Sequence, residues 1–344
     1  GTELLLNIDF RLKQAEPLMQ AGQMVAYAQL LIQEYSFLAP KIAESKFKQR
    51  VKDKAKEDIT VVGDRYQIAF DRRTGWLKQY EVDGKSLLGA NGTLRPNFWR
   101  AVTDNDMGAN INITHKVWKN PVMTLQTLEA KQQKTGTMVT AFYRMDSVQA
   151  LLTLQYFIGE NGTIQVSQQL QTNKKASTPN LFRFGMVMDL PYEMEKSVYY
   201  GRGPIENYPD RKLSQRIGRY EQMADDQFYP YIRPQETGTK GDMRWWKQTD
   251  RQGIGLKVVA DAPFYASATH YTIPDVDDGD RKEQRHSYQL KRSCFTELYL
   301  DGAHAGVGGI DSWSGWAEAL EPYQVKCEDR AFTFWLLPTE TVGD

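Results

Sequence analysis

The chain has 344 residues, of which 41% are hydrophobic and 25% are charged, and its 43 Lys and Arg residues balance 43 Asp and Glu residues. This length buries a sizeable core without disulfides, and the zero net charge gives no field that favours nucleic acid or an anionic membrane as a partner. The sequence contains no apolar run of membrane-spanning length and no signal-peptide pattern, so we expect neither feature in this chain.

The first 40 residues carry two strand patterns. Apolar and polar residues alternate from Leu4 to Leu12, which predicts a half-buried strand, and a second strand pattern covers 24–33. Two strands are too few for a stable sheet, so we interpret residues 1–42 as the end of a β-sandwich whose other strands lie outside the chain. Residues 43–58 are rich in Glu, Lys and Gln, which predicts a linker between two domains.

Short strand patterns separated by turn signals recur from Ile59 onward. The clearest hairpin joins strands over 152–158 and 164–170 through the turn Asn161-Gly162. Further strands are predicted at 66–70, 181–190, 197–200, 254–260, 264–270, 294–300 and 331–337. No segment of similar length has a helical period, so residues 59–344 predict a large all-β sandwich or a barrel-like double sheet.

The stretch from Tyr199 to Trp246 is unusually rich in Gly, Pro, Asn, Arg and aromatic residues. We predict that it forms long ordered loops rather than strands or helices, because Gly and Pro interrupt regular structure while Arg and aromatic side chains order a loop. Functional residues are often carried by loops of this kind.

No metal or nucleotide motif is complete. The run Asp104-Asn105-Asp106-Met107-Gly108 resembles the start of a calcium loop but lacks the later ligands, and the Gly201-Arg202-Gly203 run lacks the spacing of a nucleotide loop. The four histidines, which we expect to be structural, show no metal-ligand spacing; they are His115, His270, His286 and His304. We expect no metal or cofactor in this chain and predict that its two cysteines, Cys294 and Cys327, are buried free thiols.

Trp313 lies in a glycine-rich loop over 308–316, after the predicted strand at 294–300. A partly exposed indole suits the C–H face of a pyranose, and the neighbouring Asp311 and Ser312 could meet sugar hydroxyls. The alternative is that the indole fills a gap beneath the loop. The residues alone leave both interpretations open.

Hydrolysis of a glycoside needs two carboxyl groups, about 5 Å apart for retention or about 6.5–9.5 Å apart for inversion. Spacing along the sequence does not select a pair, and a structural role, in which each carboxylate accepts backbone N–H bonds in a tight loop, is favoured. The candidates in predicted loops are Asp104, Asp106, Glu206, Asp210, Glu236, Asp242 and Asp311.

Four segments closely resemble the C-terminal part of the β-galactosidases of glycoside hydrolase family 2, of the lac-operon type. They fall in order along 59–344 and cover 97–108, 201–211, 229–236 and 309–313. The chain departs from the family at Val102, where Pro is common, and at Thr237-Gly238, where Asn-Gly is frequent. The loop around Thr237 stays plausible with this change.

The resemblance implies a five-domain parent enzyme that cleaves terminal β-galactosides with retention. Residues 1–42 would be the remnant of an immunoglobulin-like domain, and 59–344 would form a β-supersandwich similar to galactose mutarotase. The catalytic glutamates would lie in a (β/α)₈ barrel outside this chain, so we expect no catalytic residue here and no activity from the chain alone. The resemblance also allows Mg and Na in the parent, and a homo-oligomer, while cytoplasm and periplasm both stay open.

The resemblance further implies site roles. The family tryptophan that matches Trp313 contacts the sugar, whereas Asp311 and Ser312 would fix its loop. The groups expected to brace loops or dock the barrel are Arg202, Glu206, Asn207, Arg211 and Arg244.

Two other functions remain as alternatives. An aldose 1-epimerase would need a His base and a carboxylic acid that converge in a sugar pocket, and no such pattern surrounds His270, His286 or His304. A standalone galactoside-binding module would bind galactosides without any partner domain.

Overall fold

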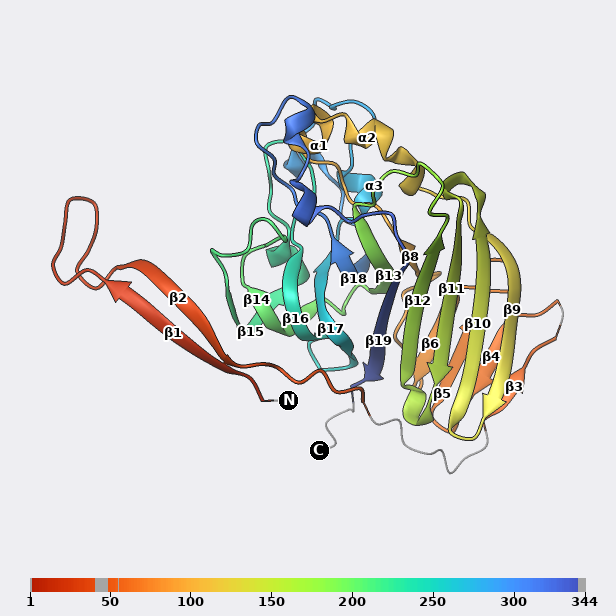
Figure 1. Cartoon of the computed structure of the whole chain (residues 1–344). Helices are drawn as coiled ribbons and strands as arrows, with labels where there is room; N and C mark the ends of the chain where they lie inside the picture. The colour runs from red at the N-terminus through yellow and green to blue at the C-terminus, as the bar shows by residue number, and fades with distance from the viewer. Residues whose placement is uncertain (1, 41–48, 55, 340–344) are drawn as a thin grey trace. The chain divides into compact units, whose positions relative to one another are not determined.

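The computed structural model describes residues 2–40, 49–54 and 56–339, and the chain divides into two compact units, Gly1–Ala39 and Pro40–Asp344. We call them the small unit and the large unit and describe each separately (Figure 1). The strands are β1 Leu4–Arg11, β2 Met24–Gln33, β3 Arg50–Lys52, β4 Ile59–Val62, β5 Tyr66–Phe70, β6 Leu77–Val82, β7 Lys85–Ser86, β8 Leu94–Asn97, β9 Thr124–Gln133, β10 Gly136–Met145, β11 Ala150–Ile158, β12 Ile164–Thr172, β13 Arg183–Pro191, β14 Lys196–Gly203, β15 Arg216–Met223, β16 Lys240–Thr249, β17 Gly255–Thr269, β18 Phe295–His304 and β19 Arg330–Pro338. The helices are α1 Asp104–Gly108, α2 Ile111–Thr114 and α3 Ile273–Val276, with 3₁₀ turns at Lys116–Trp118, Asp146–Val148, Glu160–Gly162, Ala224–Gln227, Ser287–Gln289, Gly315–Ala317 and Glu321–Tyr323.

The small unit is the antiparallel pair β1–β2, in which Leu6 faces Leu30. Both predicted strands are present. Phe10 and Leu31 are more than half exposed in the described chain. Because the expected covering strands lie outside this chain, the burial of one face stays a prediction. The assignment to an immunoglobulin-like domain stays a prediction.

The large unit is one long antiparallel sheet that folds over itself into two layers and nearly closes. The first layer runs β9-β10-β11-β12-β19-β17-β16-β14-β15, and the second runs β3-β4-β5-β6-β8-β13-β18-β17. Strand β17 belongs to both layers, since 256–260 pair with β19 and 265–269 pair with β18. The prediction of an all-β fold built as a large antiparallel supersandwich is confirmed.

The core lies between the two layers, as the alternation of β11 illustrates. Leu152, Leu154, Tyr156 and Ile158 are fully buried, while the residues between them are partly exposed. Tyr156 meets Phe70 of β5, in the other layer, with ring centroids 4.8 Å apart. Each such side chain stabilises the fold by about 1.5–3 kcal/mol through removal of apolar surface from water.

The turns follow their sequence signals. Asn161 and Gly162, at φ 60° and 75°, connect β11 to β12, and Ile158 pairs with Ile164 on the return strand. A Gly accepts this left-handed conformation without steric cost and an Asn with little. The predicted hairpin is confirmed.

The prediction that 199–246 contains no strands is wrong. Strands β14, β15 and β16 form there and pair side by side, and only the segments between them are loops. Gly201 lies inside β14. Glycine is needed at this position because an added Cβ atom would come 2.4 Å from the Cε atom of Met243 on β16. A glycine that permits close strand packing was therefore mistaken for a turn signal.

Three other predictions concern the linker at 43–58, the two cysteines and membrane-spanning segments. Within the predicted linker 43–58, Arg50–Lys52 forms β3 against β4, while 43–48 and 55 lie outside the described residues. Both cysteines are free, as predicted, but Cys294 is exposed and Cys327 is partly exposed, so their predicted burial is wrong. None of the helices in the described part of the chain has the length and apolarity that crossing a membrane requires.

Candidate functional site

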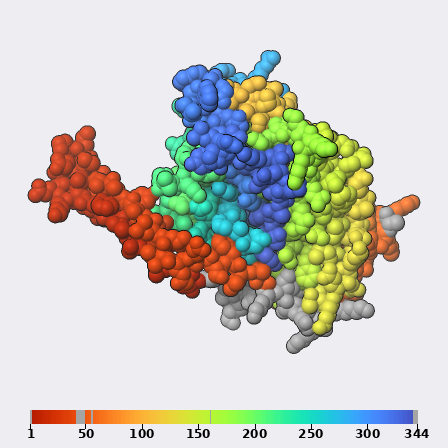
Figure 2. Space-filling model, in the orientation of Figure 1, coloured from red at the N-terminus to blue at the C-terminus, as the bar shows by residue number. Residues whose placement is uncertain are grey.

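Two of the highly exposed aromatic residues in the described part of the chain lie on the segment 307–316, which we call the Trp313 loop. It follows the end of β18 and stands at one end of the large unit beside α1 and α2 (Figure 2). Trp313 and Trp316 are 79% and 67% exposed, and Ile310 is 69% exposed. Trp313 is therefore not a plug beneath its own loop in the described structure.

Asp311 holds the turn that presents Trp313. Its Oδ1 atom accepts the backbone N–H groups of Trp313 and Ser314 at 3.1 and 3.0 Å, and its Oδ2 atom accepts the Ser314 hydroxyl at 2.6 Å. These bonds, led by the Ser314 hydroxyl, lower the pKa of Asp311. Its carboxylate is occupied by the loop, whereas the Ser312 side chain is exposed.

Helix α1 supports the loop from below. It starts at the N-cap Thr103, so the calcium-loop-like run forms a helical turn. Asn105 donates from Nδ2 to the carbonyls of Asp311 and Ala317 at 3.0 and 3.2 Å. A Cβ atom at Gly108 would lie 2.3 Å from the Ser312 carbonyl oxygen, so only glycine allows helix and loop to approach this closely.

Two charged residues hold the base of the loop. Asp210 accepts the N–H groups of Val307 and Gly308 on Oδ2 at 2.9 and 2.8 Å. The buried guanidinium of Arg100 donates to the Ala305 and Gly306 carbonyls, both at 2.9 Å. Arg100 is also ion-paired with buried Asp106 at 2.8 Å. These bonds fix the backbone at 305–308, where the loop begins.

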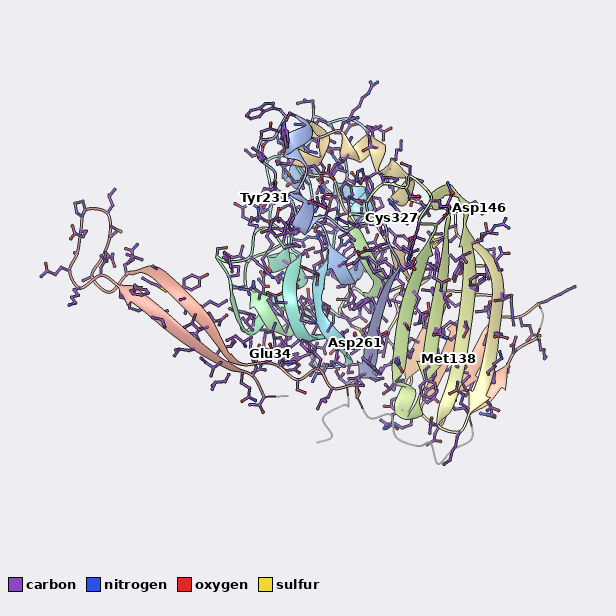
Figure 3. All side chains as sticks on the ribbon, in the orientation of Figure 1. Glu34, Met138, Asp146, Tyr231, Asp261 and Cys327 are labelled. Carbon is purple, nitrogen blue, oxygen red and sulfur yellow. The ribbon has the colours of Figure 1, made fainter. Side chains whose placement is uncertain are left out.

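Glu206 lies in the loop between β14 and β15 and accepts several hydrogen bonds there. Its carboxylate accepts bonds from Arg211, the Tyr231 hydroxyl, the Thr237 hydroxyl at 3.0 Å and the Gly238 N–H at 2.7 Å. Figure 3 labels Tyr231 among the loops at the end of the large unit that carries α1. Thr237 stands where the resembling β-galactosidases often have Asn. Its hydroxyl is one of these donors, so this difference keeps the loop joined to Glu206.

Asn207 and Arg202 connect this loop to the strands. Fully buried Asn207 donates to the Arg202 carbonyl at 3.0 Å and accepts the Gly241 N–H at 2.9 Å. Arg202 forms an ion pair with Asp242 at 2.7 Å and donates to the Gln215 carbonyl at 2.7 Å. The contacts of both residues lie within the large unit.

A cluster of buried charges lies where β18 ends, and we call it the Arg183 cluster. Arg183 is 2.7 Å from Asp301 and 3.9 Å from Glu236, and His304 Nε2 is 3.7 Å from Glu236 Oε1. Burial opposes ionisation of Glu236, but the charge of Arg183, together with the neighbouring His304 ring, outweighs it and lowers the pKa of Glu236 to about 2. Burial raises the pKa of Asp301 and lowers that of His304.

The Arg183 cluster does bring a histidine and a carboxylate together, as an epimerase would require. However, His304 is 3% exposed and Glu236 is 7% exposed. The cavity that Glu236 lines has a volume of about 30 Å³, enough for a water molecule but not for a sugar ring. The geometry therefore does not favour an epimerase.

The seven candidate carboxylates all have partners that fix the fold. Glu206, Asp210 and Asp311 accept loop N–H groups, and Asp106 accepts the Thr103 N–H at 2.8 Å. The other three pair with side chains, namely Asp104 with Arg233, Glu236 with Arg183 and Asp242 with Arg202. This arrangement favours their structural roles.

No three His, Cys, Asp or Glu side chains come together as a metal site among the described residues. The histidines make protein contacts instead. His270 bonds Asp225 at 2.9 Å, His286 bonds the Ile232 carbonyl at 2.9 Å, and His115 stacks on Phe182.

Sequence reasoning did not assign any residue to holding the Trp313 loop from outside it, although the favoured role of Asp210 as an acceptor of backbone N–H bonds is confirmed. Arg100, Asn105 and Gly108 lie in one of the resembling segments, and Asp210 lies in another. The available signal was that these two segments occur together with the resembling segment 309–313, which carries Trp313. Which of them touches the loop could not be derived, because about 100 to 200 residues separate them from it.

Comparison with known proteins gives a consistent result. The family model described as the β-galactosidase small chain matches residues 62–336. β-Galactosidases from Lactobacillus delbrueckii subsp. bulgaricus and Vibrio cholerae are each 30% identical to this chain, over 319 and 326 residues, covering 90% and 91% of it. A β-galactosidase of Priestia megaterium is 28% identical over 313 residues, covering 90% of it.

The chain spans about 30% of the length of these curated relatives, with 29% of the Priestia protein and 30% of the other two covered. Among solved structures, a galactose mutarotase related enzyme from Lactobacillus acidophilus covers 84% of this chain and 99% of its own, at 7% identity and a TM-score of 0.44. That likeness concerns the fold alone.

Proposed function

Because the matched region makes up most of its length, the chain belongs to the β-galactosidase small-chain family, and we propose that it is the accessory part of a β-galactosidase. In this proposal, the whole enzyme hydrolyses terminal non-reducing β-galactose residues with retention. The catalytic carboxylates are supplied by a (β/α)₈ domain outside this chain. Any dependence on Mg or Na and any homo-oligomeric assembly belong to that whole enzyme.

The observation that supports this role is an exposed indole on a firmly held loop. Trp313 is 79% exposed, although the loop beneath it is fixed by Asp311, Asn105, Asp210 and Arg100. Apolar groups presented in this way are typical of binding surfaces. We infer that Trp313 stacks on the galactose ring when the catalytic domain completes the pocket.

The other predicted site residues support the surface without touching the sugar. Asp311 fixes the turn, and Glu206, Asn207 and Arg202 hold the loop between β14 and β15. Ser312 contributes through its backbone, against which Gly108 packs. Because each candidate carboxylate already has a structural partner, we expect no hydrolysis by this chain alone.

The test is an o-nitrophenyl-β-galactoside assay on three samples: the 344-residue chain, the full-length enzyme and full-length Trp313→Ala. We expect no turnover by the chain alone. Trp313→Ala should raise KM by about 5- to 100-fold, which corresponds to the loss of one stacking contact.

Trp316→Ala is the matched control, because Trp316 lies in the same loop and is 67% exposed. We expect it to leave KM within about twofold of the wild type, a change of under about 0.5 kcal/mol. Equal effects of the two substitutions would contradict a specific role for Trp313. Turnover by the chain alone would contradict the accessory role.

A further inference from the structure

Arg233 joins the segment between β15 and β16 to the start of α1. Its Nε atom donates to Oδ1 of Asp104, the first residue of α1, at 3.1 Å, and its Nη1 atom donates to Oδ2 of Asp278 at 2.7 Å. The Arg233 side chain is 12% exposed, and the Asp278 side chain is fully buried. Charge-assisted hydrogen bonds from a planar guanidinium are strong and directional, so Arg233 fixes the distance between its two carboxylates.

A second residue of the same segment strengthens the link to α1. Gln235 donates from Nε2 to Oδ2 of Asp104 at 3.1 Å, and its Oε1 atom accepts the Asp104 backbone N–H at 3.3 Å. The segment itself is held by Glu206, which accepts the Tyr231 hydroxyl and the Gly238 N–H; Figure 3 labels Tyr231. The position of Asp104 is therefore set by a segment about 130 residues later in the chain.

The residues that follow Asp104 in α1 hold the Trp313 loop. Asn105 donates to the Asp311 carbonyl at 3.0 Å, and Gly108 packs so closely that an added Cβ atom would lie 2.3 Å from the Ser312 carbonyl oxygen. A displacement of α1 would therefore move the backbone on either side of the indole, because the helix and the loop are in direct contact.

We propose that Arg233 is a positioning residue that orients Trp313 toward the sugar through α1. This inference rests on the proposed function, in which Trp313 contacts the galactose ring. The hydrogen bonds of Arg233 within the described part of the chain go to Asp104, Asp278 and the Pro234 carbonyl, and none of these acceptors lies in the Trp313 loop. Arg233 thus acts on sugar binding through other residues and not by touching the sugar.

Arg285 provides a matched control. It donates from Nε to Oδ1 of Asp278 at 2.9 Å, so Arg233 and Arg285 share this buried carboxylate. Its Nη1 atom donates to the Asp275 carbonyl at 2.6 Å rather than to Asp104. Arg233→Gln and Arg285→Gln therefore each leave Asp278 with one guanidinium, and only Arg233→Gln removes the ion pair with Asp104.

The test is an o-nitrophenyl-β-galactoside assay on the full-length enzyme, comparing Arg233→Gln, Arg285→Gln, Trp313→Ala and the double variant at 233 and 313. We expect Arg233→Gln to raise KM by about 3- to 20-fold and to leave kcat within about twofold. Arg285→Gln should leave KM within about twofold. In the Trp313→Ala background, Arg233→Gln should raise KM no further, because residues that act through one contact are not additive.

Asp104→Ala removes the same link from the side of α1. The Asp104 side chain is 44% exposed, so this variant keeps the inference testable even if Arg233→Gln does not fold. It should raise KM in the same direction and, like Arg233→Gln, should have no further effect when Trp313 is already replaced. Urea unfolding would verify that each variant is folded.

The inference is overturned if Arg233→Gln and Asp104→Ala leave KM unchanged, or if Arg285→Gln raises KM equally. It is also overturned if Arg233→Gln multiplies KM by the same factor with and without Trp313, which is the result of a general structural role. If Trp313→Ala itself left KM unchanged, the proposed sugar contact would be wrong and this inference would fall with it. If Trp313→Ala alone raised KM, only the role of Arg233 would be wrong.

Discussion

The Arg183 cluster and the Trp313 loop meet at the end of β18, and they place their polar and apolar groups in opposite ways. In the cluster, Arg183, Asp301 and His304 are withdrawn almost completely from water. In the loop, two indoles lie mostly in water while polar groups beneath them fix the backbone. Asp301 and His304 belong to the strand from which the loop continues.

This difference separates buried residues, which fix the position of the backbone, from exposed residues, which are free to contact a ligand or another domain. The buried charges must keep their partners, because an isolated charge in the interior is very unfavourable. The exposed indoles contribute little to folding, so their presence on a fixed loop is better explained by binding. Mutations in the two regions should therefore affect different measurements.

The largest effect should come from Arg183→Met. It leaves Asp301 and Glu236 buried without their cation, and we expect a loss of about 3–5 kcal/mol in the free energy of unfolding, measured with urea. The matched control is Arg251→Met, since Arg251 is 80% exposed in its ion pair with Glu195 and should contribute at most about 1 kcal/mol. If both variants lost similar amounts of unfolding free energy, the proposed difference between buried and exposed charged groups would be wrong.

A smaller effect concerns pH and a second buried carboxyl of β18. Burial raises the pKa of Glu297 from 4.5 to about 7, against the opposing charge of Arg95. The folded state then holds a proton that the unfolded state has released, so stability falls as pH rises from about 4.5 to about 7. Glu297→Gln should flatten this decline by roughly 3 kcal/mol in urea unfolding series. An unchanged slope would show that Glu297 does not titrate in this window.

Gly108→Ala tests the contact between helix and loop. The added Cβ atom must displace the backbone carbonyl of Ser312 in a loop that several hydrogen bonds hold in place, so we expect a cost of about 1–3 kcal/mol in stability. In the full-length enzyme, the same variant should raise KM for the galactoside, because Trp313 moves with its loop. A loss of stability with unchanged KM would mean that the loop position is unimportant for the sugar.

The smallest expected effect is that of Trp313→Ala on folding. An indole that is 79% exposed loses few contacts on truncation, so the free energy of unfolding should change by less than about 0.5 kcal/mol. Thermal unfolding of the isolated chain measures this change. A loss above about 2 kcal/mol would show that Trp313 has a packing role after all.

The sequence was most informative where structure depends on neighbouring residues. The Asn161-Gly162 turn and the alternation of 152–158 predicted β11 and β12, because φ above zero and a period of two are local properties. The same reasoning failed at Gly201, whose meaning depends on Met243, 42 positions away. The exposure of Cys294 was missed for a similar reason, since burial is decided by distant segments.

The candidate site was predictable only in outline. Trp313 and Asp311 could be selected because they belong to one short glycine-rich loop. The outside supports of this loop could not, since Arg100, Asn105 and Asp210 reach it only when separate segments assemble. No spacing rule along the chain describes such contacts.

The pairing of β12 with β19 has a consequence for synthesis on the ribosome. Strands β9 to β12 can pair in sequence as they emerge, but the free edge of β12 has to wait for Arg330–Pro338, more than 150 residues later. During that interval the nascent chain presents an unpaired strand edge, the surface through which chains aggregate. Deletion of Arg330–Pro338 would make that exposure permanent, so loss of this one strand should affect the yield of intact protein out of proportion to its length.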